Sequence, residues 1–205
     1  DNVLTSAELA RLRVAWADDP HRVFWEFLLE TGARVGEARV VLVSDVDLDA
    51  GVWHMRRRLT RTSAGMVSRD GAKTRSGMRD VRLTDELVTL LRSHVQAMED
   101  RRRFEPQYNA GGALFPGPKA GFIRRWEIDA TLTALCETAK VPRITPHGLR
   151  HTSATEAMAA GINPKVVAER IGHRDIATTL RRYVHPDVSQ HEEAVKVLGK
   201  RLKLG

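Results

Sequence analysis

Residues 145–152 read T-P-H-G-L-R-H-T. This stretch predicts a helix, and the segments on either side of it predict the rest of the fold. A threonine followed by a proline is typical of a helix start, because the hydroxyl caps the first turn and proline suits the first helical position. His147 and Arg150 are three residues apart, so a helix places both on one face of its first turns. The stretch therefore predicts a helix that carries an imidazole and a guanidinium close together.

Toward the C-terminus the sequence predicts further short helices with clear ends. Asn163 and Pro164 repeat the cap-and-proline device, and Gly172 ends the helix that they begin. Asp175 caps a helix that ends near Tyr183. Residues 189–204 are amphipathic and basic, and we expect them to form a tail helix.

Toward the N-terminus the pattern is helical again. Thr5 and Glu8 form a capping box that opens a helix reaching about Trp16. Residues 21–31 are strongly apolar and end at Gly32, which is typical of a helix C-terminus. A short helical turn over residues 35–41 follows.

The middle of the chain reads differently, because apolar and polar residues alternate there. Val52, Trp53 and Met55, and then Val81 and Leu83, have the spacing of strands, and turn-forming residues lie between the two runs. Two helices follow, one capped by Thr84 and one over residues 122–139. The connection between them, residues 105–121, holds three prolines and four glycines, which predicts a surface segment. The fold class is therefore α+β, mainly α-helical with one small antiparallel β-sheet. Trp53 and Trp126 are expected to pack in the core or against a hairpin.

The charge balance favours an anionic partner. The chain of 205 residues has a net charge of +7 and a pI of about 10.1, and 26 of its 33 basic residues are arginine. Arginine binds phosphate oxygens with two parallel hydrogen bonds, which favours nucleic acid, although a basic surface with no binding role is the alternative. No apolar run approaches the ~20 residues of a membrane span, and the N-terminus lacks the apolar segment of a signal peptide.

The single cysteine and the first residue bear on where the protein works and on its extent. Cys136 lies in an apolar helical stretch and has no second cysteine to pair with, which fits a reducing, cytoplasmic compartment. The chain begins at Asp1 rather than Met, and we expect an N-terminal domain to precede it.

The polar residues match what cutting DNA without a metal requires. A nucleophile attacks a phosphodiester, cationic donors stabilise the charge on the non-bridging oxygens, and the leaving oxygen needs a proton. In chain order the sequence holds a set of such groups: Arg34, Lys73, His147, Arg150, His173 and Tyr183.

Four further motifs carry a family resemblance together with T-P-H-G-L-R-H-T. They are T-G-A-R-V-G-E at residues 31–37, K-T-R-S-G-M-R-D-V-R-L at 73–83, I-G-H at 171–173 and R-R-Y-V-H-P at 181–186. In this order, from about Leu4 to Pro186, the chain resembles the tyrosine recombinases, or phage-type integrases. The resemblance implies a catalytic domain over residues 1–186, a basic tail helix over residues 187–205, and a core-binding domain on the N-terminal side that this chain lacks.

The resemblance also implies roles for the residues. Arg34 and Arg150 bind the scissile phosphate, Tyr183 attacks it to form a 3′-phosphotyrosyl link, and Lys73 protonates the leaving 5′ oxygen. His147 helps to accept the tyrosine proton and His173 hydrogen-bonds the phosphate, while Glu37 and His151 support these segments. No metal, cofactor or ATP is implied. The implied partners are double-stranded DNA, three further copies of the chain on that DNA, and accessory DNA-bending or directionality proteins. The free domain, without DNA, is expected to be a monomer. A nucleoid-associated protein of a bacterium, phage or other mobile element is expected.

Several alternatives stay open. Arg75 and Arg79 lie close enough in sequence to compete with Lys73 for its role. We expect Arg56, Arg58 and Arg75 to contact DNA phosphates, whereas a solvated strand face is the other interpretation. His147 and His151 have the spacing of a zinc helix, but the helix lacks a neighbouring glutamate and an obvious third ligand. The rival functions are a type IB topoisomerase and a catalytically silent DNA-binding module.

Overall fold

A computed structural model describes residues 2–62, 65–70, 78–117 and 121–172, and residues 195, 196 and 198 in the tail; for residues 58–62 and 65–70 it describes the backbone. The helices in these ranges are α1 (Ser6–Ala15), α2 (Arg22–Thr31), α3 (Val35–Ala38), η1 (Val43–Asp45), α4 (Asp85–Phe104), α5 (Arg125–Thr138), α6 (Pro146–Ala159) and α7 (Pro164–Ile171). The strands are β1 (Val46–Asp47), β2 (Val52–Met55), β3 (Arg57–Thr62), β4 (Gly65–Asp70) and β5 (Arg79–Arg82).

Helix α2 lies at the centre of the core. The side chains of Phe24, Trp25, Phe27 and Leu28 are almost fully buried, and aromatic rings from other elements pack against two of them. The Phe27 ring packs edge-on against Trp53 of β2 with centroids 5.0 Å apart, and both Phe24 and Phe27 pack edge-on against Phe115 at 5.2 Å. Edge-to-face packing is the arrangement that the ring quadrupoles favour. The run of apolar residues before Gly32 is therefore the centre of the fold.

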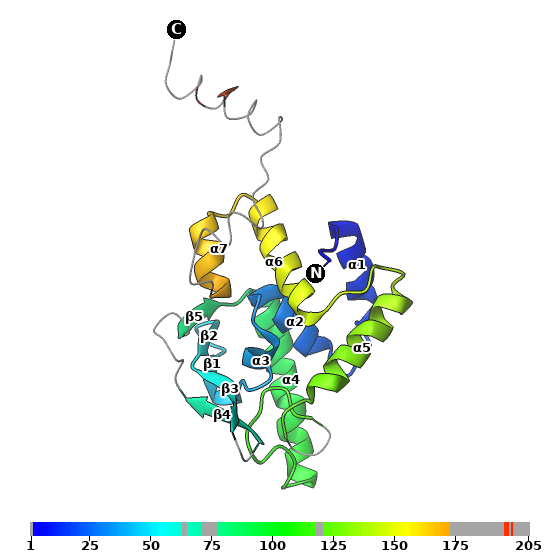
Figure 1. Cartoon of the computed structure of the whole chain (residues 1–205). Helices are drawn as coiled ribbons and strands as arrows, with labels where there is room; N and C mark the ends of the chain where they lie inside the picture. The colour runs from blue at the N-terminus through cyan, green and yellow to red at the C-terminus, as the bar shows by residue number, and fades with distance from the viewer. Residues whose placement is uncertain are drawn as a thin grey trace.

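Other helices surround α2, as Figure 1 shows. Helices α6 and α7 lie together at one end of the molecule, α1 packs on α5, and α4 runs along the side of α2 away from α6. The N-terminal segment is tied to α6, because the Leu4 amide donates to Thr152 Oγ1 at 3.2 Å. This arrangement brings α6 and α7, far along the sequence, against the end of α2.

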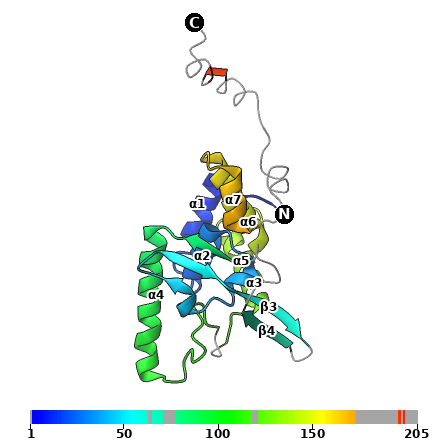
Figure 2. The same cartoon turned by 90° about the vertical axis from the view of Figure 1, so that its left-hand side faces the viewer.

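The strands form two sheets where the sequence predicted one. The predicted sheet is present: β2 pairs with both β1 and β5 in antiparallel register, with Trp53 opposite Val81. A separate ribbon of β3 and β4 follows, with Arg57 opposite Asp70, and it projects from the body on the side away from α4 (Figure 2). Turn-forming residues predicted a loop or hairpin here; a hairpin this long was not evident, because Arg57–Arg69 lacks a clear apolar alternation.

Most predicted helix ends are confirmed. Thr5, Thr84, Thr145 and Asn163 each cap a helix through a side-chain oxygen, and Gly32 and Gly172 have left-handed φ values of 60° and 71° at helix ends. Helix α3 ends at Ala38 and α5 begins at Arg125, so both are shorter than the sequence predicted.

Two packing predictions are wrong. The connection after α4 is not simply a surface segment, because Leu114 and Phe115 are nearly fully buried and the Leu114 amide donates to Val41 O at 2.8 Å. Trp53 is buried as predicted, but Trp126 is 63% exposed. Trp126 lies in the first turn of α5 on the side away from the core-facing Ile128, and the amphipathic phase of the helix decides its exposure.

The predicted helix ending near Tyr183 lies outside the described residues, as does most of the predicted tail helix. Residues 195, 196 and 198 are helical, and Val195 and Leu198 are exposed. Among the described residues, no helix combines the length and apolar composition that crossing a bilayer would require.

Candidate active site

The turn between α2 and α3 presents the first predicted site residue. Gly32 adopts a left-handed conformation that ends α2, and Arg34 follows as the N-cap residue of α3. The Arg34 amide donates to Glu37 Oε2 at 3.0 Å, and Arg34 Nη1 donates to Glu37 Oε1 at 2.9 Å. Half of the Arg34 side chain is exposed. Glu37 therefore holds both the backbone and the guanidinium of Arg34, and its supporting role in catalysis stays a prediction.

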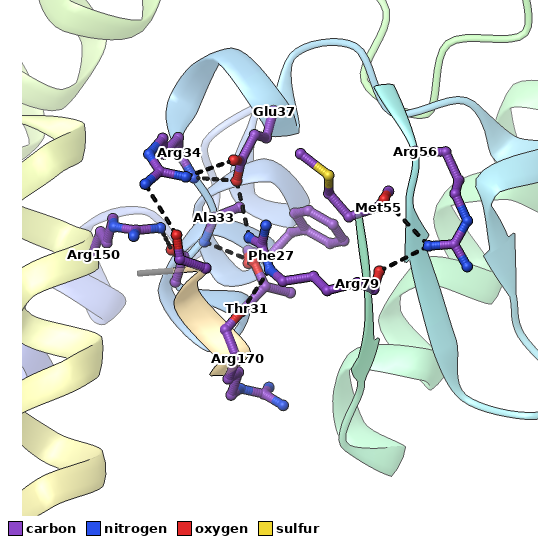
Figure 3. A network of polar contacts seen from close by, with 12 residues as sticks. Phe27, Thr31, Ala33, Arg34, Glu37, Met55, Arg56, Arg79, Arg150 and Arg170 are labelled. Carbon is purple, nitrogen blue, oxygen red and sulfur yellow. Dashed lines mark hydrogen bonds and ion pairs between the residues drawn. The ribbon is translucent and has the colours of Figure 1, made fainter. Parts of the chain in front are cut away.

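Helix α6 brings the second arginine to the same turn. Arg150 is 1% exposed, and its Nη1 donates to the Gly32 carbonyl oxygen at 2.6 Å. Figure 3 shows Arg150 reaching from α6 toward the segment that carries Arg34. The Arg150 guanidinium thus binds the backbone turn that carries Arg34, more than a hundred residues away in sequence.

The two histidines of α6 pack on each other. The rings of His147 and His151 are 4.2 Å apart, in an edge-on arrangement. His147 is exposed in the first turn of the helix, while His151 is 3% exposed one turn further on. The buried His151 ring lies against the exposed His147 ring, and the supporting role of His151 stays a prediction.

The C-terminal end of α7 lies beside Arg34. Gly172 follows the helix, and its carbonyl oxygen accepts a hydrogen bond from Arg34 Nη2 at 3.2 Å. The next residue in sequence is His173. His173, Lys73, Arg75 and Tyr183 all lie outside the described residues, so their positions relative to Arg34 and Arg150 stay predictions.

Arg79 of β5 belongs to this cluster, whereas the sequence indicated it only as an alternative to Lys73. Arg79 Nη2 donates to Glu37 Oε2 at 3.0 Å, and Nε donates to the Arg170 carbonyl oxygen at 2.8 Å. Its side chain is 9% exposed. An alternating strand pattern would have placed Arg79 on the same face as the buried Val81, and that was the available signal.

Glu37 is a buried carboxylate that stays ionised. Burial alone raises the pKa of Glu37, but the charge and hydrogen bond of Arg79, together with the hydrogen bond and charge of Arg34, outweigh it. The pKa of Glu37 is therefore held below its ordinary value. The carboxylate links the two arginines as a fixed negative charge.

Of the arginines predicted to contact DNA, Arg56 already forms hydrogen bonds within the chain. Arg56 Nη2 donates to Asp80 Oδ1 at 2.6 Å and its Nη1 to the Arg79 carbonyl at 3.2 Å, while the neighbouring Arg57 bonds to both carboxylate oxygens of Asp45. Arg58 lies on β3, where its backbone pairs with Arg69. DNA contact by Arg56 and Arg58 stays a prediction.

The described part of the site suits an anion. The half-exposed guanidinium of Arg34 and the buried one of Arg150 are both held by backbone carbonyls of the Gly32 and Gly172 turns. Donors fixed in this way need no reorganisation when a charge develops beside them, which is how electrostatic stabilisation of a transition state works. Within the described ranges, no group of three or more histidine, cysteine or acidic residues is arranged to hold a metal ion.

Comparison with known proteins identifies related chains. The sequence profile of the Phage integrase family matches residues 2–190. The integrase of Staphylococcus phage L54a is 27% identical over 173 residues, which cover 83% of this chain and 49% of the relative. The tyrosine recombinase XerC of Mycobacterium leprae is 32% identical over 181 residues, covering 84% of this chain and 53% of the relative. The chain thus spans about half the length of the curated relatives that it matches.

Solved structures share the fold. The Tn1549 transposon integrase, in complex with transposon right end DNA, superposes with a TM-score of 0.79 at 23% identity, covering 97% of this chain and 66% of that one. The catalytic domain of bacteriophage HP1 integrase gives a TM-score of 0.59 at 22% identity, covering 97% and 95%. The fold is that of a tyrosine recombinase catalytic domain, and with a family profile that matches nearly its whole length, the chain belongs to the phage integrase family of tyrosine recombinases.

Proposed function

We propose that this chain is the catalytic domain of a site-specific recombinase that cleaves and rejoins double-stranded DNA. The observation that carries the proposal is that Arg150 binds the Gly32 turn, which carries Arg34, while Arg34 binds the Gly172 carbonyl that precedes His173. Membership of the phage integrase family supports it.

The two arginines bind the scissile phosphate and stabilise the charge on its non-bridging oxygens. Tyr183 attacks the phosphorus to form a 3′-phosphotyrosyl bond and release a 5′ oxygen, which Lys73 protonates. His147 helps to accept the phenolic proton, and His173 hydrogen-bonds the phosphate. Because the covalent bond keeps the free energy of the phosphodiester, attack by the 5′-hydroxyl rejoins the strand without ATP.

The same proposal covers domains and partners. Residues 1–186 form the catalytic domain and residues 187–205 a tail helix that packs on a neighbouring copy of the chain. Recombination joins two duplexes, so four copies act together on DNA, with accessory DNA-bending or directionality proteins. The Tn1549 integrase was solved with transposon right end DNA and XerH with its difH substrate, which supports duplex DNA as the partner. Relatives from a phage, a transposon and bacteria support a role in mobile-element movement or chromosome recombination.

A nicked suicide substrate tests the reaction. When the short fragment after the scissile phosphate diffuses away, the enzyme stays covalently bound to DNA and migrates as an adduct on a denaturing gel. The chain has two tyrosines, Tyr108 and Tyr183. We expect Tyr183→Phe to abolish the adduct and Tyr108→Phe to leave it unchanged.

Three outcomes would contradict the proposal. An adduct that persists in Tyr183→Phe would mean that another residue is the nucleophile. Duplex binding without any adduct from the parent chain, on substrates that carry its own site, would favour the silent DNA-binding module. The type IB topoisomerase would be recognised by relaxation of supercoiled plasmid without strand exchange between two sites.

A further inference from the structure

Glu37 is shared between two arginines that come from different elements. Its Oε1 accepts from Arg34 Nη1, whereas its Oε2 accepts from Arg79 Nη2 and from the Arg34 amide. Glu37 and Arg79 are both more than nine-tenths buried at their side chains, while Arg34 is half exposed. A buried arginine, a buried carboxylate and a half-exposed arginine therefore form a chain that leads from the interior to the candidate site (Figure 3).

Arg79 also holds the end of α7. Its Nε donates to the Arg170 carbonyl, and its guanidinium lies directly against Gly172. A Cβ atom at Gly172 would lie 2.8 Å from Arg79 Nη1 and 3.0 Å from Cζ, closer than such atoms pack. The guanidinium also faces the Trp53 ring, with Cζ 5.8 Å from its centroid. Arg79 thus fills the space between β2, α3 and the last turn of α7.

We propose that Arg79 is a positioning residue: gripping Glu37 and the Arg170 carbonyl together, it directs the Arg34 guanidinium and fixes Gly172, the residue before His173. This inference rests on the proposed function, because it assigns Arg34 to the site where DNA is cleaved. Arg79 does not itself contact the phosphate.

The geometry explains why Arg79 acts on position more than on folding. Without the Arg79 fork, Glu37 is held only by the amide and Nη1 of Arg34 itself, so the carboxylate no longer ties the Arg34 guanidinium to β5. Helix α7 itself is also attached by the Arg170 side chain, which donates to the Arg82 carbonyl at 2.7 Å and to the Glu30 carbonyl at 3.1 Å, so losing the Arg79 contact affects Gly172 without detaching the helix. A conservative variant at Arg79 is therefore expected to fold with α7 in place.

Arg79→Lys is the informative variant. Lysine keeps the positive charge beside Glu37, but a single ammonium lacks the planar fork that reaches both Glu37 and the Arg170 carbonyl. Arg82→Lys is the matched control on the same strand, because the Arg82 side chain is exposed and reaches the Ala50 carbonyl instead. The Arg82 carbonyl that Arg170 uses is unchanged in this control.

The first measurement needs no activity. In nitrogen-15 NMR spectra of the full chain, the Arg34 Nη protons, which bond to Glu37 and Gly172, should give separate, slowly exchanging signals. An Arg34→Lys sample assigns them. We expect these signals to broaden or merge in Arg79→Lys and to persist in Arg82→Lys. Unchanged Arg34 signals in a folded Arg79→Lys protein would overturn the inference, whatever the protein does to DNA.

The second measurement separates binding from cleavage. On the suicide substrate we expect Arg79→Lys to slow single-turnover cleavage ~10- to 100-fold, since a small misplacement of a catalytic group has such effects, with the dissociation constant for duplex DNA changed less than about threefold. The double variant Arg34→Lys/Arg79→Lys should be no slower than Arg34→Lys alone, because both act through one group. Additive losses, or equal losses of binding and cleavage, would contradict the inference. If the parent chain itself failed to cleave, the proposed function would fail, while the NMR result would still decide the role of Arg79.

Discussion

Glu37 shows at the scale of one residue how this protein keeps a charge in its interior. Removing a carboxylate from water is costly unless hydrogen bonds and opposite charges compensate for it. Here Arg79 and Arg34 occupy both carboxylate oxygens, and they hold the pKa of Glu37 below 4.5, its ordinary value. The carboxylate is thus a fixed structural anion at neutral pH.

Glu37→Gln should make stability less dependent on pH. Because folding lowers the pKa of Glu37, the carboxylate contributes stability that is fully present above its unfolded pKa and is lost as pH falls through its folded pKa. We expect the variant to lose about 3 kcal/mol of unfolding free energy at pH 7, since breaking a buried ion pair leaves uncompensated charge. Urea unfolding of the parent and of Glu37→Gln at pH 7, 5 and 3.5 measures the difference in unfolding free energy.

The difference between the parent and Glu37→Gln should shrink as pH falls below about 4.5, in the direction that linkage gives. Glu99→Gln, on the exposed side of α4, is the control and should change stability little at any of these pH values. If the unfolding free energies of the parent and Glu37→Gln differed by a constant amount from pH 7 to 3.5, ionisation of Glu37 would not be the source of the lost stability.

Gly32→Ala tests the turn on which both arginines depend. Gly32 has a φ of 60°, and a Cβ there would lie 2.7 Å from Ile171 Cγ2, so the variant is strained and also pushes α7 away. We expect a loss of roughly 2 kcal/mol, measured by urea unfolding, together with slower suicide-substrate cleavage. Gly36→Ala is the matched control: nothing lies within 4 Å of its Cβ, and alanine suits a helix, so stability should stay equal or rise. Equal effects of the two variants would contradict this account.

At the scale of the element, α6 is the helix that brings the candidate site together. Thr145 Oγ1 accepts from the Gly148 amide at 3.1 Å and Pro146 starts the helix, so its N-terminus begins at a defined residue. The start of the helix fixes which side each later residue faces. Arg150 consequently points inward to Gly32, and His147 lies at the surface.

Thr145→Ala should cost about 1 kcal/mol, because it leaves an amide of the first helical turn without its capping acceptor. Thr145→Ser keeps the hydroxyl and should retain most of the stability. Thermal and urea unfolding compare the two variants. Fraying of the first turn affects His147 more than the buried Arg150, so cleavage should fall while the core stays intact. A serine variant as unstable as the alanine variant would show that the methyl group, not the cap, is responsible.

At the scale of the whole molecule, the net charge and the shape both favour duplex DNA as the partner. The net charge is +7, and the β3–β4 ribbon, which carries Arg57, Arg58 and Arg61, projects away from the body (Figure 2). Binding to duplex DNA would release counterions from each phosphate that a basic side chain neutralises.

Duplex binding should therefore weaken steeply with salt. For about five phosphate contacts, the logarithm of the association constant should fall with the logarithm of salt concentration with a slope of about −4.5. Fluorescence anisotropy between 50 and 200 mM salt, as rough limits, measures the slope. Arg58→Ala should make it shallower by about 1 if this residue binds a phosphate. A flat profile would contradict extensive backbone contact.

The sequence by itself determined most of the described helices, the caps at their ends and the family. Thr5, Thr145 and Asn163 cap helices and Gly172 ends one as predicted, because capping depends on residues within one turn of each other. The alternation at Val52–Met55 and around Val81 likewise predicted paired strands. The order of Arg34, His147, Arg150 and the residues outside the described ranges indicated the family, since those residue types are what phosphodiester chemistry needs.

Tertiary structure decided what depends on contacts between distant segments. It buried Leu114 and Phe115 in a connection whose composition favoured the surface, and it exposed Trp126, since only the packed core fixes which face of a helix turns inward. It also brought Arg79 between Glu37 and Arg170, residues 42 and 91 positions away, which no local pattern contains. Hydrogen bonds between residues close in sequence can be predicted from the sequence. A buried network of charged residues forms only when distant segments pack together in the folded chain.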